Sequence, residues 1–344
     1  MSNSRSNPET DTRSHASRPT MHDVAAVAGV SQMTVSRALR GEGSVSNEVK
    51  ARVTQAARQL GYIHNRLASV QRGMENPMVA VILPTLKNTV FTDVLAGIND
   101  TLSAHNVRPV FGVSEYSQTE EENLLRDMLS WQPCGVILSG LEHSDGVRRA
   151  LEKMDVRVAE VMDIDGSPMD ACFGISQRGV GIEMAEHLLD RGYRRVAYLG
   201  SQGGSDLRAA KRFDAFKSRF ADGGGAVVFE HVAEAPSSMA LGRDLTVSVF
   251  ETAPHCDAVY FSNDDLAAGG LMHCIASNVS VPEHIALAGF NGLPFLSALP
   301  QQITTTRTPL YDIGAAAALH VVGDDRGARL AKSLAHELIV GSTT

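Results

Sequence analysis

Residues 21–40 read MHDVAAVAGVSQMTVSRALR, and this stretch predicts two short helices joined by a tight turn. Thr20 is placed to cap the first helix, and Gly29 ends it because glycine adopts a left-handed C-terminal residue without steric cost. Ser31 is placed to cap the second helix, and apolar residues recur at helical spacing in both. A helix-turn-helix requires this spacing, although an ordinary helical hairpin would show the same pattern.

The second helix would present its side chains to a DNA groove. Three of them can read bases, since Gln32 can pair with adenine, Arg37 with guanine, and Met33 can touch a thymine methyl group. Thr34 and Ser36 are expected to meet phosphates or to hold the domain together.

A third helix and a polar segment follow, and they favour a DNA-binding head over a plain hairpin. Ser46 is placed to cap a helix that runs to about residue 59, after which residues 61–73 read GYIHNRLASVQRG. Part of this segment can form a short helix that Gly73 and Pro77 terminate. We therefore interpret residues 20–63 as the head and residues 64–76 as a hinge helix and linker.

Four motifs of the head carry a family resemblance. They are TMHDVAAVAGVS at 20–31, TVSRAL at 34–39, VS at 45–46 and LGYIHNR at 60–66. In order and spacing they resemble the N-terminal domain of the LacI/GalR family of bacterial repressors.

Three pieces of the body, LPTLKNTVFTDVLAGI from residue 83, MLSW from residue 128 and SNDDLAAGG from residue 262, resemble the gluconate repressors within that family. The resemblance extends from about Thr20 to the C-terminus and is weakest between Ala221 and Thr252. It implies a repressor that binds double-stranded operator DNA as a homodimer, so that the operator is palindromic. It also implies control by a small sugar-acid effector, and by resemblance alone we expect gluconate.

In the family the hinge helix forms on operator DNA, and two copies enter the minor groove, where a leucine usually wedges between base pairs. Here Gln71 stands where that leucine is expected, Val70 is the nearest apolar residue, and His64 replaces a common proline. These departures put the wedge in question more than the hinge itself. The full set of expected DNA-contacting residues is Thr20, Ser31, Gln32, Met33, Thr34, Ser36, Arg37, Tyr62, Asn65, Arg66, Val70 and Gln71.

The net charge of −8 over 344 residues is unevenly divided. Residues 1–76 contain ten Lys and Arg against six Asp and Glu, a balance of +4, whereas the remainder contains 21 against 33, a balance of −12. The basic excess thus lies on the head, where DNA phosphates would be met.

The N-terminus does not read as a targeting segment. Residues 1–19 are polar and lack the apolar core of a secretory signal, so we expect a disordered tail. No run of 18 apolar residues predicts a membrane span, and the four cysteines lack metal-site spacing. These features predict a cytoplasmic protein with free thiols and without a membrane partner.

From residue 78 onward, apolar strand-like runs alternate with amphipathic helices. Repeated βα units with continuous apolar strands indicate a doubly wound parallel sheet, and a second series begins near Gly174. Two such lobes resemble the periplasmic-binding-protein architecture that this family uses as its effector-binding and dimerisation domain. The predicted α/β body, residues 77–344, has a first lobe of about 77–175 plus 305–331 and a second of about 176–304 plus 332–344.

Polar residues after the strands are candidates for a ligand site, because ligands of open α/β sheets bind beyond the carboxyl ends of the strands. Asn88, Val90 and Phe91 follow the first strand, where an aromatic ring suits the C–H face of a sugar and core packing is the alternative. Asp163 could accept hydrogen bonds from sugar hydroxyls, or could be a solvated loop residue. Asn291 is a further candidate on the same rim.

Arg212 is the main candidate for effector specificity. The family carries an effector-contacting arginine three residues before a Gly-aromatic pair, and RFDAF preserves this spacing with alanine in the glycine position; Arg208 is the rival in a shifted register. A guanidinium can bind a carboxylate bidentately, which suits a sugar acid. The family-like pair Asn263 and Asp264 could bind vicinal hydroxyls, although a helix N-cap, which Asp264 or Asp265 could serve, is the alternative.

No catalytic motif is present in the sequence, so we expect neither an enzyme, nor a metal site, nor a cofactor. A solute-binding protein of a transporter would share the cleft chemistry, but it predicts an export signal and no basic helical head. A regulator of the same family that its ligand co-represses or activates remains open, because the sequence does not fix the sign of the response.

Overall fold

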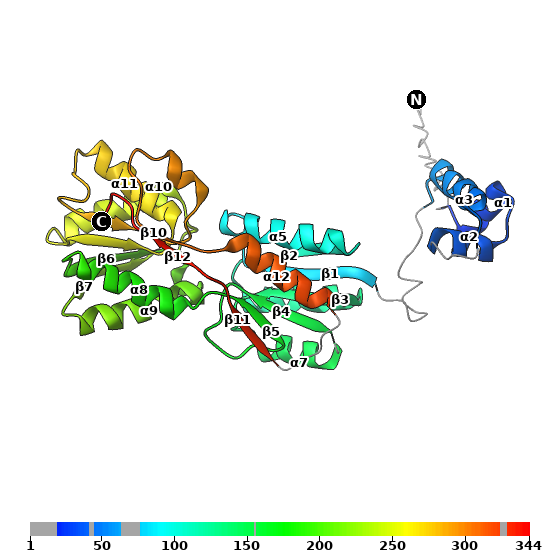
Figure 1. Cartoon of the computed structure of the whole chain (residues 1–344), viewed down its shortest axis with the longest axis horizontal. Coiled ribbons are helices and arrows are strands. Elements are labelled where there is room, and N and C mark those ends of the chain that lie inside the picture. The colour runs from blue at the N-terminus through cyan, green and yellow to red at the C-terminus, as the bar shows by residue number, and fades with distance from the viewer. Residues whose placement is uncertain (1–18, 41–44, 63–75, 155, 324–328) are drawn as a thin grey trace, which may run out of the picture. The chain divides into compact units, whose positions relative to one another are not determined.

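The computed structural model describes residues 19–344 apart from residues 41–44, 63–75, 155 and 324–328. The chain divides into two compact units, a head within Met1–Met74 and a body over Glu75–Thr344 (Figure 1). The predicted tail up to residue 18 and the hinge residues Asn65, Arg66, Val70 and Gln71 lie outside the described residues.

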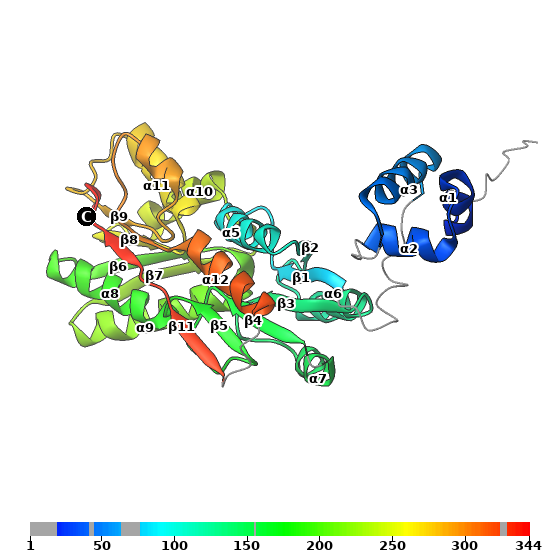
Figure 2. The same cartoon turned by 45° about the vertical axis from the view of Figure 1, so that its right-hand side comes forward.

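The head contains the three predicted helices, α1 (Met21–Ala28), α2 (Gln32–Arg40) and α3 (Asn47–Leu60) (Figure 2). Thr20 and Asp23 form a capping box at the start of α1, and Gly29 ends it with a φ of 63°. Ser31 accepts a hydrogen bond from the Thr34 N–H at 3.2 Å, as predicted for the start of α2. The small apolar core packs all three helices together, with Val24, Val35 and Val53 fully buried at its centre.

The first lobe of the body is a six-stranded parallel sheet in the order β11-β5-β4-β3-β1-β2. Helices α5 (Val90–Ala104) and α12 (Leu310–Val322) pack on one face, and α6 (Gln118–Leu129) and α7 (Asp145–Met154) on the other. Both faces are thus covered, which explains the continuous apolar runs of the strands. The strand bounds are β1 Asn76–Leu83, β2 Arg108–Val113, β3 Pro133–Ser139, β4 Arg157–Val161, β5 Ala171–Gly174 and β11 Leu330–Ser333.

The second lobe is a four-stranded parallel sheet in the order β7-β6-β8-β9. Helices α8 (Gln177–Asp190) and α9 (Leu207–Asp222) pack on one face, and α10 (Met239–Thr252) and α11 (Asp264–Ala276) on the other. The strands are β6 Arg195–Gly200, β7 Ala226–Val232, β8 Ala258–Phe261 and β9 Ala286–Ala288. The predicted pair of doubly wound lobes is therefore confirmed.

The chain crosses between the lobes more than once, and two short antiparallel strands mark the crossing. β10 (Thr305–Arg307) pairs with β12 (Glu337–Ile339), while α12 and β11 between them belong to the first lobe. The chain then ends against the second lobe, where the Leu287 N–H donates to the Thr343 carbonyl at 2.8 Å. β11 ends at Ser333, two residues past the boundary of 331 expected for the first lobe.

Within the described part of the chain, no helix is both long enough and apolar enough to cross a membrane.

Candidate functional site

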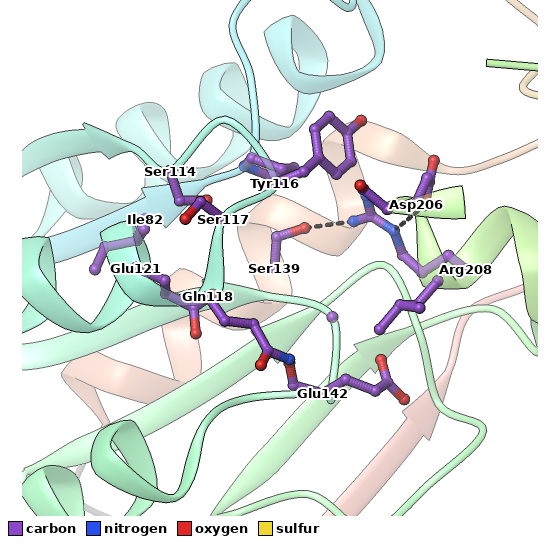
Figure 3. Close-up of a pocket in the computed structure, with 14 residues that line it drawn as sticks. Ile82, Ser114, Tyr116, Ser117, Gln118, Glu121, Ser139, Glu142, Asp206 and Arg208 are labelled. Atoms are coloured by element: carbon purple, nitrogen blue, oxygen red, sulfur yellow. Dashed lines mark hydrogen bonds and ion pairs between the residues drawn. The ribbon is translucent and has the colours of Figure 1, made fainter. Parts of the chain in front are cut away.

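The carboxyl ends of both sheets face a cleft that holds two adjoining cavities. The smaller, here called the inner pocket, has a volume of about 40 Å³. The larger, the outer cavity, has about 250 Å³ and is drawn in Figure 3. Tyr116, Asp206 and Arg208 line both of them, and each cavity is lined by side chains of both lobes.

Most of the predicted effector residues meet in the inner pocket. Six of the eight line it, namely Asn88, Val90, Phe91, Arg212, Asn263 and Asn291. Asp163 and Asp264 line neither cavity.

Arg212 lies on α9 with its guanidinium held in the floor of the inner pocket. Nη1 donates to Gln177 Oε1 at 2.5 Å, Nη2 donates to the Ser262 carbonyl at 2.8 Å, and the group stacks 3.5 Å from the centroid of Phe290. The residue is 4% exposed. Among the described residues, no carboxylate lies within 4.0 Å of this cation, so its direct partners are neutral groups, and the charge of Asp206 acts on it only from a greater distance.

Gly181 allows α8 to approach α9 at this point. A Cβ at position 181 would lie 2.1 Å from the carbonyl oxygen of Arg212, a distance that only a glycine hydrogen permits. The same helix α8 supplies Gln177, so this close approach brings the amide and the guanidinium together.

Arg208, one turn before Arg212, is a paired cation on the wall between the two cavities. Its Nε donates to Asp206 Oδ1 at 3.3 Å, and its Nη1 reaches across the cleft to Ser139 Oγ at 2.5 Å (Figure 3). The guanidinium also lies 5.6 Å from the centroid of Phe91. Burial alone would raise the pKa of Asp206, but the charges of Arg208 and Arg212 hold it below its ordinary value.

Asn263 and Asp264 stand at the start of α11 in different roles. Asn263 is the N-cap, with Oδ1 accepting from the Leu266 N–H at 3.1 Å. The helix-capping role that the sequence also allowed for Asp264 or Asp265 thus belongs to Asn263. Asp264 is fully buried and accepts from the Leu293 N–H at 2.9 Å and the Thr305 hydroxyl at 2.7 Å. Burial raises the pKa of Asp264 to about 6 although these hydrogen bonds oppose the shift. In this arrangement Asp264 ties α11 to the strand β10 that crosses between the lobes.

Three of the eight non-glycine residues with a positive φ in the described part of the chain line the inner pocket. Tyr116, Met162 and Asn291 all line it and have φ values of 61°, 79° and 118°. Side chains other than glycine rarely adopt such angles, and they persist at functional sites where the surrounding structure fixes them. This feature is independent of the sequence motifs and indicates the same site.

On the head, α2 exposes Gln32, Met33 and Arg37, the three residues predicted to read bases. Gln32 Nε2 lies 3.1 Å from His22 Nδ1, which links α2 to α1. Ser36 is only 8% exposed, which favours the second of its two expected roles, holding the domain together. The base and phosphate contacts themselves stay predictions.

Several residues of the cleft were not among the predicted set. Ser139, Tyr116 and Gln177 come from segments without a distinctive motif. The sequence did contain a pattern that groups the cations of α9. Positions 208, 211 and 212 have the spacing i, i+3 and i+4, so their side chains share one face of the helix.

Comparison with known proteins identifies the family. Residues 20–65 match the family described as bacterial regulatory proteins of the lacI family, and residues 76–333 match periplasmic binding proteins and the sugar binding domain of the LacI family. The HTH-type transcriptional regulator GntR of Pseudomonas aeruginosa is 40% identical over 305 residues, which cover 88% of this chain and 88% of that protein.

Two solved structures are similar over long stretches. The crystal structure of a LacI family transcriptional regulator from Silicibacter pomeroyi is 39% identical with a TM-score of 0.89, covering 94% of this chain and 99% of that one. The transcription regulator GntR of Chromobacterium violaceum is 34% identical with a TM-score of 0.70, covering 77% of this chain and 98% of that one. These relatives are regulators rather than enzymes, as the sequence predicted. The chain belongs to the LacI family and is a DNA-binding transcriptional repressor.

Proposed function

We propose that a small sugar acid, D-gluconate, binds between the two lobes and lowers the affinity of this repressor for its operator. The observation that carries the proposal is the buried guanidinium of Arg212, which has no carboxylate within 4.0 Å in the described part of the chain. Burying an unpaired charge is costly, and a ligand carboxylate would supply the missing partner in a bidentate geometry. A neutral sugar would leave this cation unpaired.

The sizes of the cavities set how such a ligand lies. The inner pocket of about 40 Å³ has room for only a few water molecules, so a six-carbon acid must extend beyond it. With its carboxylate at Arg212, the hydroxyl-bearing chain passes Arg208 into the outer cavity, where Ser114, Ser139 and Gln118 offer donors and acceptors. Phe91 offers an apolar ring to the C–H groups of the chain.

The response of DNA binding follows from linkage between the two sites. A ligand held by residues of both lobes favours the arrangement in which the lobes meet, and it shifts the equilibrium only by its differential affinity for the two states. In the proposed homodimer, movement of the lobes changes the contact between the first lobes of the two subunits. This change lowers the affinity of the two heads for a palindromic operator. The site of action is the cytoplasm.

The heads read the operator through α2. Gln32, Met33 and Arg37 contact base edges in the major groove, while the basic excess of residues 1–76 attracts the phosphates. Base contacts supply specificity and phosphate contacts supply affinity that falls as salt is raised.

The test is fluorescence anisotropy of labelled DNA from upstream of the protein's own gene, titrated with the full chain in the absence and presence of D-gluconate. The variant Arg212→Ala is expected to bind this DNA as the natural protein does and to lose the response to gluconate. Its matched control is Arg219→Ala, on the same helix, where the arginine forms a half-exposed ion pair with Glu186 at 3.0 Å.

Release of DNA by gluconate that only Arg212→Ala abolishes supports the proposal. Binding that gluconate strengthens would instead favour a co-repressed regulator. An unaltered response in Arg212→Ala would refute the role of this arginine.

A further inference from the structure

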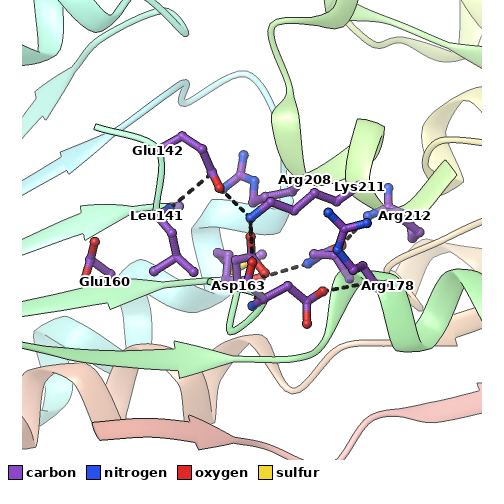
Figure 4. Close-up of polar contacts among 12 residues, drawn as sticks. Leu141, Glu142, Glu160, Asp163, Arg178, Arg208, Lys211 and Arg212 are labelled. Atoms are coloured by element: carbon purple, nitrogen blue, oxygen red, sulfur yellow. Dashed lines mark hydrogen bonds and ion pairs between the residues drawn. The ribbon is translucent and has the colours of Figure 1, made fainter. Parts of the chain in front are cut away.

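A lysine beside Arg212 joins the two lobes through ion pairs. Lys211 projects from α9 of the second lobe, and its Nζ lies 2.5 Å from Asp163 Oδ2 and 2.5 Å from Glu142 Oε1 (Figure 4). Nζ also donates to the Asp165 carbonyl at 3.2 Å. Asp163 and Glu142 follow strands β4 and β3 of the first lobe, so every one of these contacts crosses the cleft. We call Lys211, Asp163 and Glu142 the lysine bridge.

We propose that Lys211 is a positioning residue that holds the lobes together and thereby sets the affinity for the effector without touching it. The proposal deepens, and in its affinity readout rests on, the function proposed above. Lys211 and Asp163 line neither cavity, whereas Arg208, which also reaches across the cleft, lines both. Of the three bridge residues, Glu142 alone lines a cavity, the outer one, so the buried contact between Lys211 and Asp163 lies outside the walls of both cavities.

The lysine bridge can hold the lobes together because its central ion pair is buried. The Asp163 side chain is fully buried and the Lys211 side chain is 14% exposed, while that of Glu142 is 34% exposed. Among the described residues, Lys211 is the one cation within 4.0 Å of Asp163, whose other oxygen accepts from the Asp165 N–H at 2.9 Å. A buried carboxylate that loses its cation must be rehydrated, and separating the lobes is the way to admit water.

The charged form of the lysine is retained at this position. Burial alone would lower the pKa of Lys211, but the hydrogen bonds and charges of Asp163 and Glu142 raise it above the ordinary value. Lys211 therefore carries its positive charge at neutral pH.

An effector that needs both lobes binds only the population in which the lobes meet, so its apparent affinity scales with that population. Removing the charge of Lys211 lowers the population, and the apparent affinity falls with it. The lysine bridge also explains why Asp163, predicted as an effector ligand, lies outside both cavities: its carboxylate is occupied by Lys211.

The test compares Lys211→Met, which keeps the aliphatic stem and removes the charge, with Lys217→Met in the full chain. Lys217 lies on the same helix, but its ion pair with Glu230 at 2.8 Å is within the second lobe and about half exposed. The first readout is hydrogen exchange, by mass spectrometry and without effector, of residues 162–166, which carry the buried end of the bridge. The second readout is the Kd for D-gluconate by calorimetry.

In Lys211→Met we expect exchange of residues 162–166 to accelerate and the Kd to rise, each about tenfold, as the loss of a largely buried pair implies. Lys211→Arg retains a cation and is expected to restore both values to within about threefold. Lys217→Met is expected to match the natural protein in both. A far-ultraviolet circular dichroism spectrum of Lys211→Met that matches the spectrum of Lys217→Met shows that the variant is folded.

Exchange and Kd that remain within twofold of the Lys217→Met values would overturn the proposal. If the natural protein binds no gluconate, the effector assignment fails, and the exchange readout alone decides whether the bridge holds the lobes together.

Discussion

Replacing Gly181 by alanine tests whether the packing of α8 on α9 sets the geometry of the effector site. The new Cβ would lie 2.1 Å from the Arg212 carbonyl oxygen, and because ordinary contact begins near 3.4 Å, the two helices must separate by more than 1 Å. Overpacking of this kind costs about 1–3 kcal/mol, which the higher helix propensity of alanine offsets by at most about 1 kcal/mol.

The same separation reaches the site itself. It stretches the 2.5 Å hydrogen bond between Arg212 Nη1 and Gln177 Oε1, which joins α9 to α8. Loss of about 1 kcal/mol from a charged hydrogen bond that positions the guanidinium weakens effector binding about fivefold. We therefore expect Gly181→Ala to lower both the melting temperature of the body and the affinity for D-gluconate, measured by calorimetry.

Gly179→Ala is the matched control on the same helix. Its Cβ would meet only the side chain of Ser176, the N-cap of α8, at 3.0 Å from Oγ and 3.2 Å from Cβ. A shift of a few tenths of an ångström relieves this contact, so we expect a smaller loss of stability than in Gly181→Ala and no loss of affinity. Equal melting temperatures and equal Kd values for Gly181→Ala and the natural protein would show that the helix contact does not position Arg212.

Two further predictions concern pH and the head. Burial alone would lower the pKa of His143, but its contacts with Glu121 at 2.7 Å and Glu160 at 3.4 Å raise it to about 9. Since this exceeds the unfolded value of about 6.5, the stabilisation, on the order of 3 kcal/mol, is fully present below pH 6.5 and is lost as pH rises through about 9. Urea unfolding from pH 6 to 9 should show this loss, and His143→Gln should flatten it; a natural protein equally stable across the range would contradict the assignment. In the head, Thr20→Ala removes the capping box and should cost about 1 kcal/mol and weaken operator binding with the Kd for gluconate unchanged, whereas Thr20→Ser should retain both.

The head was predictable because its signals are local. Thr20, Asp23 and Gly29 lie within ten residues of one another, and caps and apolar periodicity fix the ends and the buried face of α1. The same holds for the parallel sheets, whose buried strands are continuous apolar runs. The rim positions of Asn88 and Asn263 followed from the rule that ligands bind beyond the carboxyl ends of the strands, whereas that of Arg212, inside α9, followed from the family resemblance.

The partners of the two aspartates were not predictable in this way. Asp163 is paired with Lys211, 48 residues away, and Asp264 with Thr305, 41 residues away, and no local pattern shows either contact. Both carboxylates therefore resembled open ligand groups in the sequence. The strands β10, β11 and β12 have only three or four residues, and all of β11 is exposed, so they lack the apolar runs that mark the other strands.

The most direct measurement of the central claim is the calorimetric comparison of D-gluconate with D-glucitol on the full chain. The two differ at one end of the same carbon chain, where glucitol carries a neutral hydroxymethyl group in place of the carboxylate. If the buried Arg212 pairs with the carboxylate of the effector, glucitol binds at least about a hundredfold more weakly than gluconate, because glucitol leaves the cation unpaired. Equal affinity for the two compounds, or binding of glucitol alone, would contradict the account.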